Sequence, residues 1–124
     1  MTTPHYDVVI AGAGPAGCAA AIRLRQFDIS VCLIDDVQDK IWKIGESLPG
    51  AAIRLLDRLG IQNLDQLLTP REYVACVANV AAWGTNDWTY YDAIRNPQSG
   101  GWHILRHRFD TALRQLALQK GVAF

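Results

Sequence analysis

The chain has 124 residues, is 50% hydrophobic and 19% charged, and carries 12 basic and 12 acidic side chains, which give zero formal net charge. This composition is that of one soluble globular domain at most, and it excludes the strongly basic surface typical of proteins that bind nucleic acid or anionic membranes. No apolar run reaches the roughly 18 residues that a membrane span needs, and the N-terminus lacks the positive region of a signal peptide. We therefore expect a cytoplasmic protein that binds neither nucleic acid nor membrane.

The three cysteines are widely spaced, at Cys18, Cys32 and Cys76, and no CxxC pair is present. None of the three histidines lies at metal-ligand spacing from a cysteine. We expect reduced, mostly buried thiols and no metal site.

The first forty residues predict a strand, a glycine-rich turn, a helix and a second strand. Residues 6–11 are apolar and β-branched, as in a strand that is covered on both faces of a parallel sheet. The sequence GAGPAG follows at 12–17, and residues 18–25 are strong helix formers. A second β-branched run at 29–34 ends at Asp35.

The turn matches the pattern GxGxxG, and Asp35 follows its last glycine by 18 positions. In a dinucleotide-binding unit, Gly12 permits the tight turn, Gly14 lets backbone N–H groups approach a pyrophosphate, and Gly17 lets helix and strand pack closely. The positive end of the helix dipole then faces the phosphates. Pro15 suits the first position of that helix, because its φ is already set.

The acidic residue after the second strand predicts which dinucleotide binds. Asp35 is placed to accept hydrogen bonds from ribose hydroxyls, and its charge repels a 2′-phosphate, so FAD or NAD is expected rather than NADP. Asp36 could take this role by a one-residue slip. The alternative is a βαβ unit whose glycine turn binds no ligand.

Four segments together resemble a known family. The sequence YDVVIAGAGPAGCAAAIRL at 6–24 is similar to the opening of the flavoproteins with two dinucleotide-binding domains, in which a GxGPAG turn, here including Pro15 and Ala16, holds the ADP half of FAD. The segments GESLP at 45–49, AWG at 82–84 and GWHILRHRFD at 101–110 resemble the flavin-dependent monooxygenase and halogenase superfamily.

The resemblance covers essentially the whole chain. It implies an α/β, Rossmann-like FAD/NAD(P)-binding domain, in which a parallel sheet with helices carries inserted β-strands. Residues 1–124 are then the N-terminal portion of an FAD-binding domain, apparently truncated, because a strand at 121–124 begins just before the chain stops. We expect such a piece to be flavin-poor, marginally stable and prone to pair through an open sheet edge.

The GESLP segment precedes a predicted helix that begins near Pro49 and presents apolar residues at 52, 55, 56 and 59. Gly60 suits the position after its end, Ile61 closes the hydrophobic contact, and Ser47 is expected as its N-cap. The resemblance implies that Gly45, Glu46 and Ser47 approach the flavin or its ribityl chain. The alternative is a surface loop whose serine only caps a helix.

The rest of the chain predicts a short helix at 63–68, a long strand at 73–83, a second strand at 88–91, a turn at 96–101 and a strand at 102–105. A helix is expected from about 108 to 120. The resemblance implies that Arg106, just before it, reaches the phosphate or ribose oxygens of FAD; a surface arginine is the alternative. At least two of the four tryptophans are expected to pack in a core or sheet.

The resemblance implies a monooxygenase whose reduced flavin reacts with O₂ to a hydroperoxide and oxygenates an aromatic or tryptophan-like substrate. That substrate is a small molecule or is carried by a protein, and the electrons come from NAD(P)H or a flavin reductase. No side chain of this chain stands out as an acid, base or nucleophile, so no catalytic residue is assigned.

Three alternatives stay open at this point. The first is a flavin-dependent halogenase, which needs a lysine before the tryptophan that corresponds to Trp83; this chain has no lysine between Leu64 and Gly101, and carries Ala75 and Asn79 at the plausible positions. The second is an accessory flavoprotein that modifies tryptophan in a partner protein. The third is an inactive fragment that binds nothing.

Overall fold

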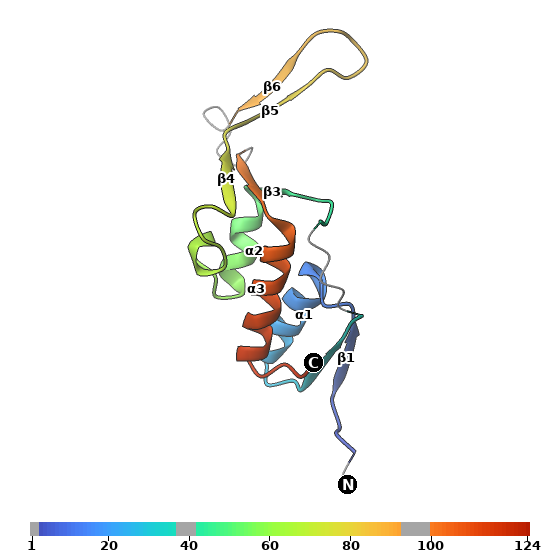
Figure 1. Ribbon diagram of the computed structural model, residues 1–124. Helices are drawn as coiled ribbons and strands as arrows, with labels where there is room; N and C mark the ends of the chain where they lie inside the picture. The colour runs from blue at the N-terminus through green and yellow to red at the C-terminus, as the bar shows by residue number, and fades with distance from the viewer. Residues whose placement is uncertain (1–2, 37–41, 93–99) are drawn as a thin grey trace. The chain divides into compact units, whose positions relative to one another are not determined.

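The computed structural model describes residues 3–36, 42–92 and 100–124, which belong to two compact units (Figure 1). The first unit comprises Met1–Trp42 and His107–Phe124, and the second comprises Lys43–Arg106. Residues 96–99 of the predicted turn lie outside the described residues.

The first unit is built on a parallel strand pair. Strand β1 (Val8–Ala11), helix α1 (Pro15–Arg25) and strand β2 (Val31–Ile34) follow one another, and the two strands are aligned over all four of their residues. Ala123 forms a parallel bridge with Cys32 on the other side of β2. The βαβ arrangement and the third strand position confirm the predicted α/β fold.

The core of the first unit draws on both of its helices. α1 buries Cys18, Ala21 and Ile22. Helix α3 (Arg106–Gln119) buries Phe109, Asp110, Leu113 and Ala117, close to the predicted apolar face.

The strand pair is covered less completely than expected. Val9 and Ile34 are each 56% exposed, and the side chains of β1 alternate between half-buried and exposed. Within the described residues, the helices therefore cover only one face of β1. The prediction that both faces of this strand are covered is wrong for the described part of the chain. The two-residue period of a strand sends alternate side chains to the open face.

Asp7 ties the start of β1 to the start of β2. Its Oδ2 accepts hydrogen bonds from the Ser30 backbone N–H at 2.8 Å and from the Ser30 hydroxyl at 2.6 Å. These bonds hold the pKa of Asp7 below its ordinary value of 3.8, the side-chain bond being the larger cause. The folded protein favours the carboxylate form of Asp7. The stability that these bonds contribute is therefore fully present at a pH above the ordinary pKa, and it is lost as the pH falls through the lower pKa of the folded state.

The second unit contains a three-stranded antiparallel sheet and a hairpin. In the sheet, β7 (Gly101–Ile104) lies between β3 (Ser47–Pro49) and β4 (Tyr73–Cys76). The hairpin pairs β5 (Ala78–Ala81) with β6 (Thr89–Asp92) (Figure 1).

The prediction of a single long strand at 73–83 is wrong in one respect. The strand breaks at Val77, because β4 pairs with β7 whereas β5 pairs with β6. A run of β-branched residues predicts extended backbone but not where the chain changes its pairing partner.

Helix α2 (Ala52–Arg58) ends as its sequence predicts. The Gly60 N–H donates to the Asp57 carbonyl at 2.8 Å and the Ile61 N–H donates to the Leu56 carbonyl at 2.9 Å, which together form a Schellman motif. Of the predicted apolar stripe, Leu56 and Leu59 are buried, whereas Leu55 is 61% exposed. A 3-10 helix (Leu64–Gln66) follows, with Asn63 and Gln66 forming a capping box.

Most of the tryptophans do not pack as expected. Trp42, Trp83 and Trp88 are 80%, 94% and 65% exposed, and only Trp102, in β7, is half-buried. The expectation that at least two of them are buried in a core or sheet is therefore wrong for the described residues.

Candidate functional site

The glycine-rich turn connects β1 to α1 as predicted. Gly12 has φ +105, a backbone conformation that L side chains rarely adopt. Its N–H donates to the Ile34 carbonyl at 2.7 Å, which fastens the turn to the end of β2. The turn therefore lies at the carboxyl ends of both parallel strands, where ligands bind in open α/β sheets.

The other two glycines of the motif meet different surroundings. A Cβ atom at Gly17 would lie 1.8 Å from the Gly12 carbonyl oxygen and 3.4 Å from Cγ2 of Ile10. At Gly14 a Cβ atom would meet nothing within 4 Å. Packing inside the protein therefore requires glycine at 17 but leaves open space at 14, as a turn that admits a ligand would.

The N-terminus of α1 favours an anion. Gly14 is its N-cap and supplies no side-chain cap, and Pro15 takes the first helical position. The first intrahelical bond runs from the Cys18 N–H to the Gly14 carbonyl at 2.9 Å. No acidic side chain lies in the first turn, so the positive end of the helix dipole and the N–H groups of Ala16 and Gly17 suit a phosphate.

Asp35 lies beside this turn. Its Oδ2 accepts a hydrogen bond of 2.6 Å from the Ala13 backbone N–H, and the residue is exposed. Within the described residues, its second carboxylate oxygen makes no hydrogen bond. The structure thus brings together the glycine turn and the acid that the sequence spacing pairs, while contact with a ribose stays a prediction.

Cys18 stabilises the turn from the protein interior, a role that we did not predict from the sequence. It is fully buried, and its thiol donates to the Ala13 carbonyl at 3.3 Å. Burial raises the pKa of Cys18, so the thiol stays protonated and inert. The sequence feature that could have predicted this role is the position of Cys18 one turn into α1, because a side chain there faces the preceding loop.

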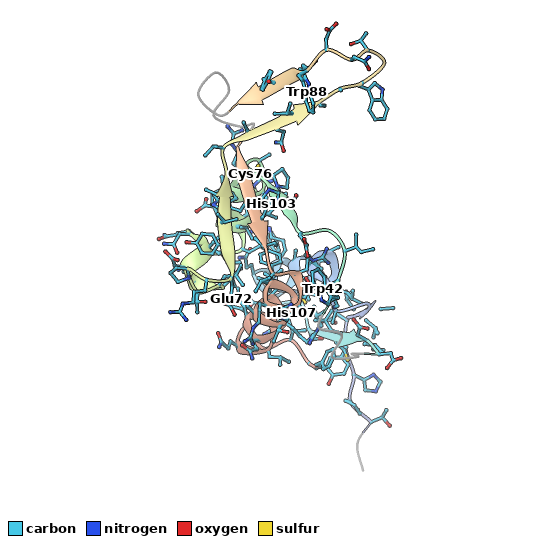
Figure 2. The ribbon with its side chains drawn as sticks, turned by 45° about the horizontal axis from the view of Figure 1, so that its top comes forward. Trp42, Glu72, Cys76, Trp88, His103 and His107 are labelled. Carbon is cyan, nitrogen blue, oxygen red and sulfur yellow. The ribbon has the colours of Figure 1, made fainter. Side chains whose placement is uncertain are left out.

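The predicted flavin loop belongs to the second unit. Ser47 begins β3, where it lies opposite His103 of β7 (labelled in Figure 2). Helix α2 instead starts after Ala51, which provides no side-chain cap. The prediction that Ser47 caps this helix is therefore wrong: its backbone pairs with a strand more than fifty residues away, which a local helix-start pattern does not reveal.

Arg106 contacts this loop, and it belongs to helix α3 instead of preceding the helix as predicted. It is the first residue of α3, and its Nη1 donates to the carbonyl oxygens of Ile44 and Gly45, at 3.1 and 3.3 Å. Gly45 and Glu46 have exposed side-chain positions. The second unit thus brings Gly45, Glu46, Ser47 and Arg106 together, and their contact with a cofactor stays a prediction.

A small hollow lies beside Ser47 in the second unit. Its volume is about 130 Å³, and Ser47, Cys76, Asn79 and Trp102 are among the residues that line it. Pockets for small molecules usually enclose about 300–1,000 Å³. The hollow is thus smaller than the pockets that usually hold small molecules.

No three His, Cys, Asp or Glu side chains within 3–36, 42–92 and 100–124 gather closely enough to hold a metal ion. Over the same ranges, no helix has both the length and the apolar character that crossing a bilayer takes.

Comparison with known proteins finds flavoproteins that are similar to this chain. Residues 6–55 match the family model described as pyridine nucleotide-disulphide oxidoreductase. A 1H-pyrrole-2-carbonyl-peptidyl-carrier protein brominase of Pseudoalteromonas luteoviolacea is 32% identical over 120 residues, which are 96% of this chain and 28% of the brominase. The chain therefore spans little more than a quarter of that curated relative.

Two solved structures share the fold. A flavin-dependent brominase is 28% identical, with a TM-score of 0.75 over 97% of this chain and 29% of the brominase. A flavoprotein/dehydrogenase from Cytophaga hutchinsonii is 26% identical, with a TM-score of 0.76 over 94% of this chain and 29% of the other. The chain has the Rossmann-like, FAD-binding fold of the flavin-dependent halogenases and related flavoproteins, as its motifs predict.

Proposed function

We propose that the first unit binds the ADP half of FAD at the glycine turn. The pyrophosphate lies over Gly14 at the N-terminus of α1, where the backbone N–H groups of Gly14, Ala16 and Gly17 donate to its oxygens, while Gly12 and Pro15 shape the turn. The free carboxylate oxygen of Asp35 accepts a hydrogen bond from the ribose. The bond between Asp35 and Ala13, at 2.6 Å, carries the proposal, because it holds the acid at the turn before any ligand arrives.

A second part of the proposal concerns the loop at Gly45 in the second unit. Gly45, Glu46 and Ser47 contact the flavin or its ribityl chain, and Arg106 belongs to the same part of the site. Support comes from the GESLP segment and from the exposure of all three loop residues.

Removing the Asp35 carboxylate is expected to weaken FAD binding. In Asp35→Ala, the ribose loses a charged hydrogen-bond acceptor and the Ala13 N–H loses its partner, so the Kd for FAD is expected to rise by about 10-fold or more. Titration of the purified protein with FAD, followed by flavin fluorescence, measures this. Asp36→Ala is the matched control, because it removes the same type of side chain at the next position in the chain. Equal effects of the two substitutions would contradict the assignment of Asp35.

The proposed reaction is oxygenation of an aromatic substrate by a flavin-dependent oxidoreductase. Bound FAD supplies the redox chemistry and the activation of O₂, while the protein binds, orients and shields it from water. NAD(P)H or a flavin reductase is proposed as the electron source, and the substrate is a small aromatic molecule or a protein-borne one such as tryptophan. The absence of lysine between Leu64 and Gly101 supports oxygenation over halogenation.

Halogenation is the second candidate, which the 32% identity to a brominase favours. The protein, supplied with FAD, NADPH and a flavin reductase, is incubated with tryptophan or phenol, with and without bromide. Oxygenation predicts products that gain one oxygen whether or not bromide is present. A product with the isotope doublet of bromine, formed only with bromide, would replace oxygenation by halogenation as the reaction.

A further inference from the structure

The loop at Gly45 is held by hydrogen bonds from Ile104 and Arg106 of the second unit. The Ile104 N–H donates to the Glu46 carbonyl at 2.7 Å, which extends the pairing of β3 and β7 by one bond. Two residues further along the chain, Arg106 donates from Nη1 to the Ile44 and Gly45 carbonyls. The end of β7 and the start of α3 thus bind every carbonyl from 44 to 46.

The opposite end of the loop is fixed by a side-chain contact. Ser47 Oγ and His103 Nδ1 lie 3.3 Å apart, within hydrogen-bond distance, across paired positions of β3 and β7. The loop is therefore attached by backbone pairing at one end and by a guanidinium at the other.

Gly45 and Arg106 fit each other closely. Gly45 has φ +98, and a Cβ atom there would lie 2.6 Å from Nη1 of Arg106. A side chain at 45 would therefore displace the guanidinium from the two carbonyls. The glycine is needed both for its backbone conformation and for room for the arginine.

We propose that Arg106 is a positioning residue, which fixes the backbone of the Gly45–Ser47 loop in the shape that receives the flavin. This rests on the proposed function, and it differs from the role that the sequence implied, a guanidinium that itself binds FAD. A charged donor bonded to two neutral carbonyls is worth more than an ordinary hydrogen bond. Its removal therefore frees one end of the loop.

The first measurement is made without FAD. Amide hydrogen exchange of Ile104 reports on the loop, because this N–H is bonded to the Glu46 carbonyl, whereas Leu105 N–H is bonded to Glu72 on the β4 side. Arg106→Met, which keeps the length of the side chain, is expected to speed exchange at Ile104 by about 10-fold while Leu105 changes little. Arg54→Met, an exposed arginine of α2, is the control. Unchanged exchange at Ile104 in Arg106→Met would overturn the proposal.

The second measurement separates positioning from direct contact with FAD. The Kd for FAD is measured for Gly45→Ala, Arg106→Met and the double variant. If Arg106 acts through the loop, the Kd of the double variant for FAD is no higher than that of the single variant with the higher Kd. The reason is that either change breaks the same contact between the guanidinium and the loop carbonyls. Additive losses would overturn the proposal, since they indicate an independent contact of Arg106 with the cofactor.

A conservative replacement completes the test. Arg106→Lys keeps the charge and one donor, so it is expected to restore part of the Ile104 protection that Arg106→Met loses. If the wild-type protein binds no FAD at all, the proposed function fails, whereas the exchange measurements still decide whether Arg106 holds the loop. The two failures are thus distinguishable.

Discussion

Gly17→Ala is expected to be the most destabilising single substitution in the first unit. The new Cβ would lie 1.8 Å from the Gly12 carbonyl oxygen, a backbone atom that cannot rotate away. Either α1 must move off β1 or the turn must open, at a cost of about 3 kcal/mol or more. For a chain of this size, such a loss lowers the thermal unfolding midpoint by roughly 10 °C, which circular dichroism measures.

The neighbouring glycine provides the control for that substitution. Gly14→Ala adds the same methyl group where nothing lies within 4 Å and where φ is −78, so its midpoint is expected to stay close to that of the wild type. A Gly17→Ala protein as stable as Gly14→Ala would contradict the close packing of helix and strand at this turn.

Gly14→Val is expected to abolish most FAD binding without unfolding the protein. The branched side chain occupies the open space at the N-terminus of α1, so a pyrophosphate no longer reaches the backbone N–H groups there. Losing two or more hydrogen bonds to an anion raises the Kd by about 100-fold. Flavin fluorescence titration measures the Kd, and circular dichroism checks the fold.

Ala20→Val is the matched control, because it places the same valine side chain at an exposed position of α1. It is expected to leave the Kd for FAD unchanged. A Gly14→Val protein that binds FAD as tightly as Ala20→Val would show that the pyrophosphate does not lie over this turn.

Local sequence predicted the first unit well. The β-branched runs that become β1 and β2, the turn with its glycines and the helix that opens with Pro15 are each set by residues close together in the chain. The bond between Asp35 and Ala13 follows from the same spacing, because both lie at the carboxyl ends of adjacent parallel strands. What this pattern did not indicate was the exposed face of the strand pair.

The second unit was harder to predict because its contacts join distant segments. Ser47 begins a strand rather than capping a helix, since its partner His103 is remote in sequence. Strand pairing also changes at Val77, where the sequence pattern continues unbroken. The guanidinium of Arg106 binds loop carbonyls, and only the glycine at 45 hinted that a close contact was needed there.

A crystal structure of the protein soaked with ADP tests the binding of the ADP moiety most directly. We expect a diphosphate within hydrogen-bond distance of the first N–H groups of α1, and a ribose hydroxyl bonded to the carboxylate of Asp35. Nucleotide density elsewhere on the protein, with the turn from Gly12 to Gly17 empty at saturating ADP, would contradict it.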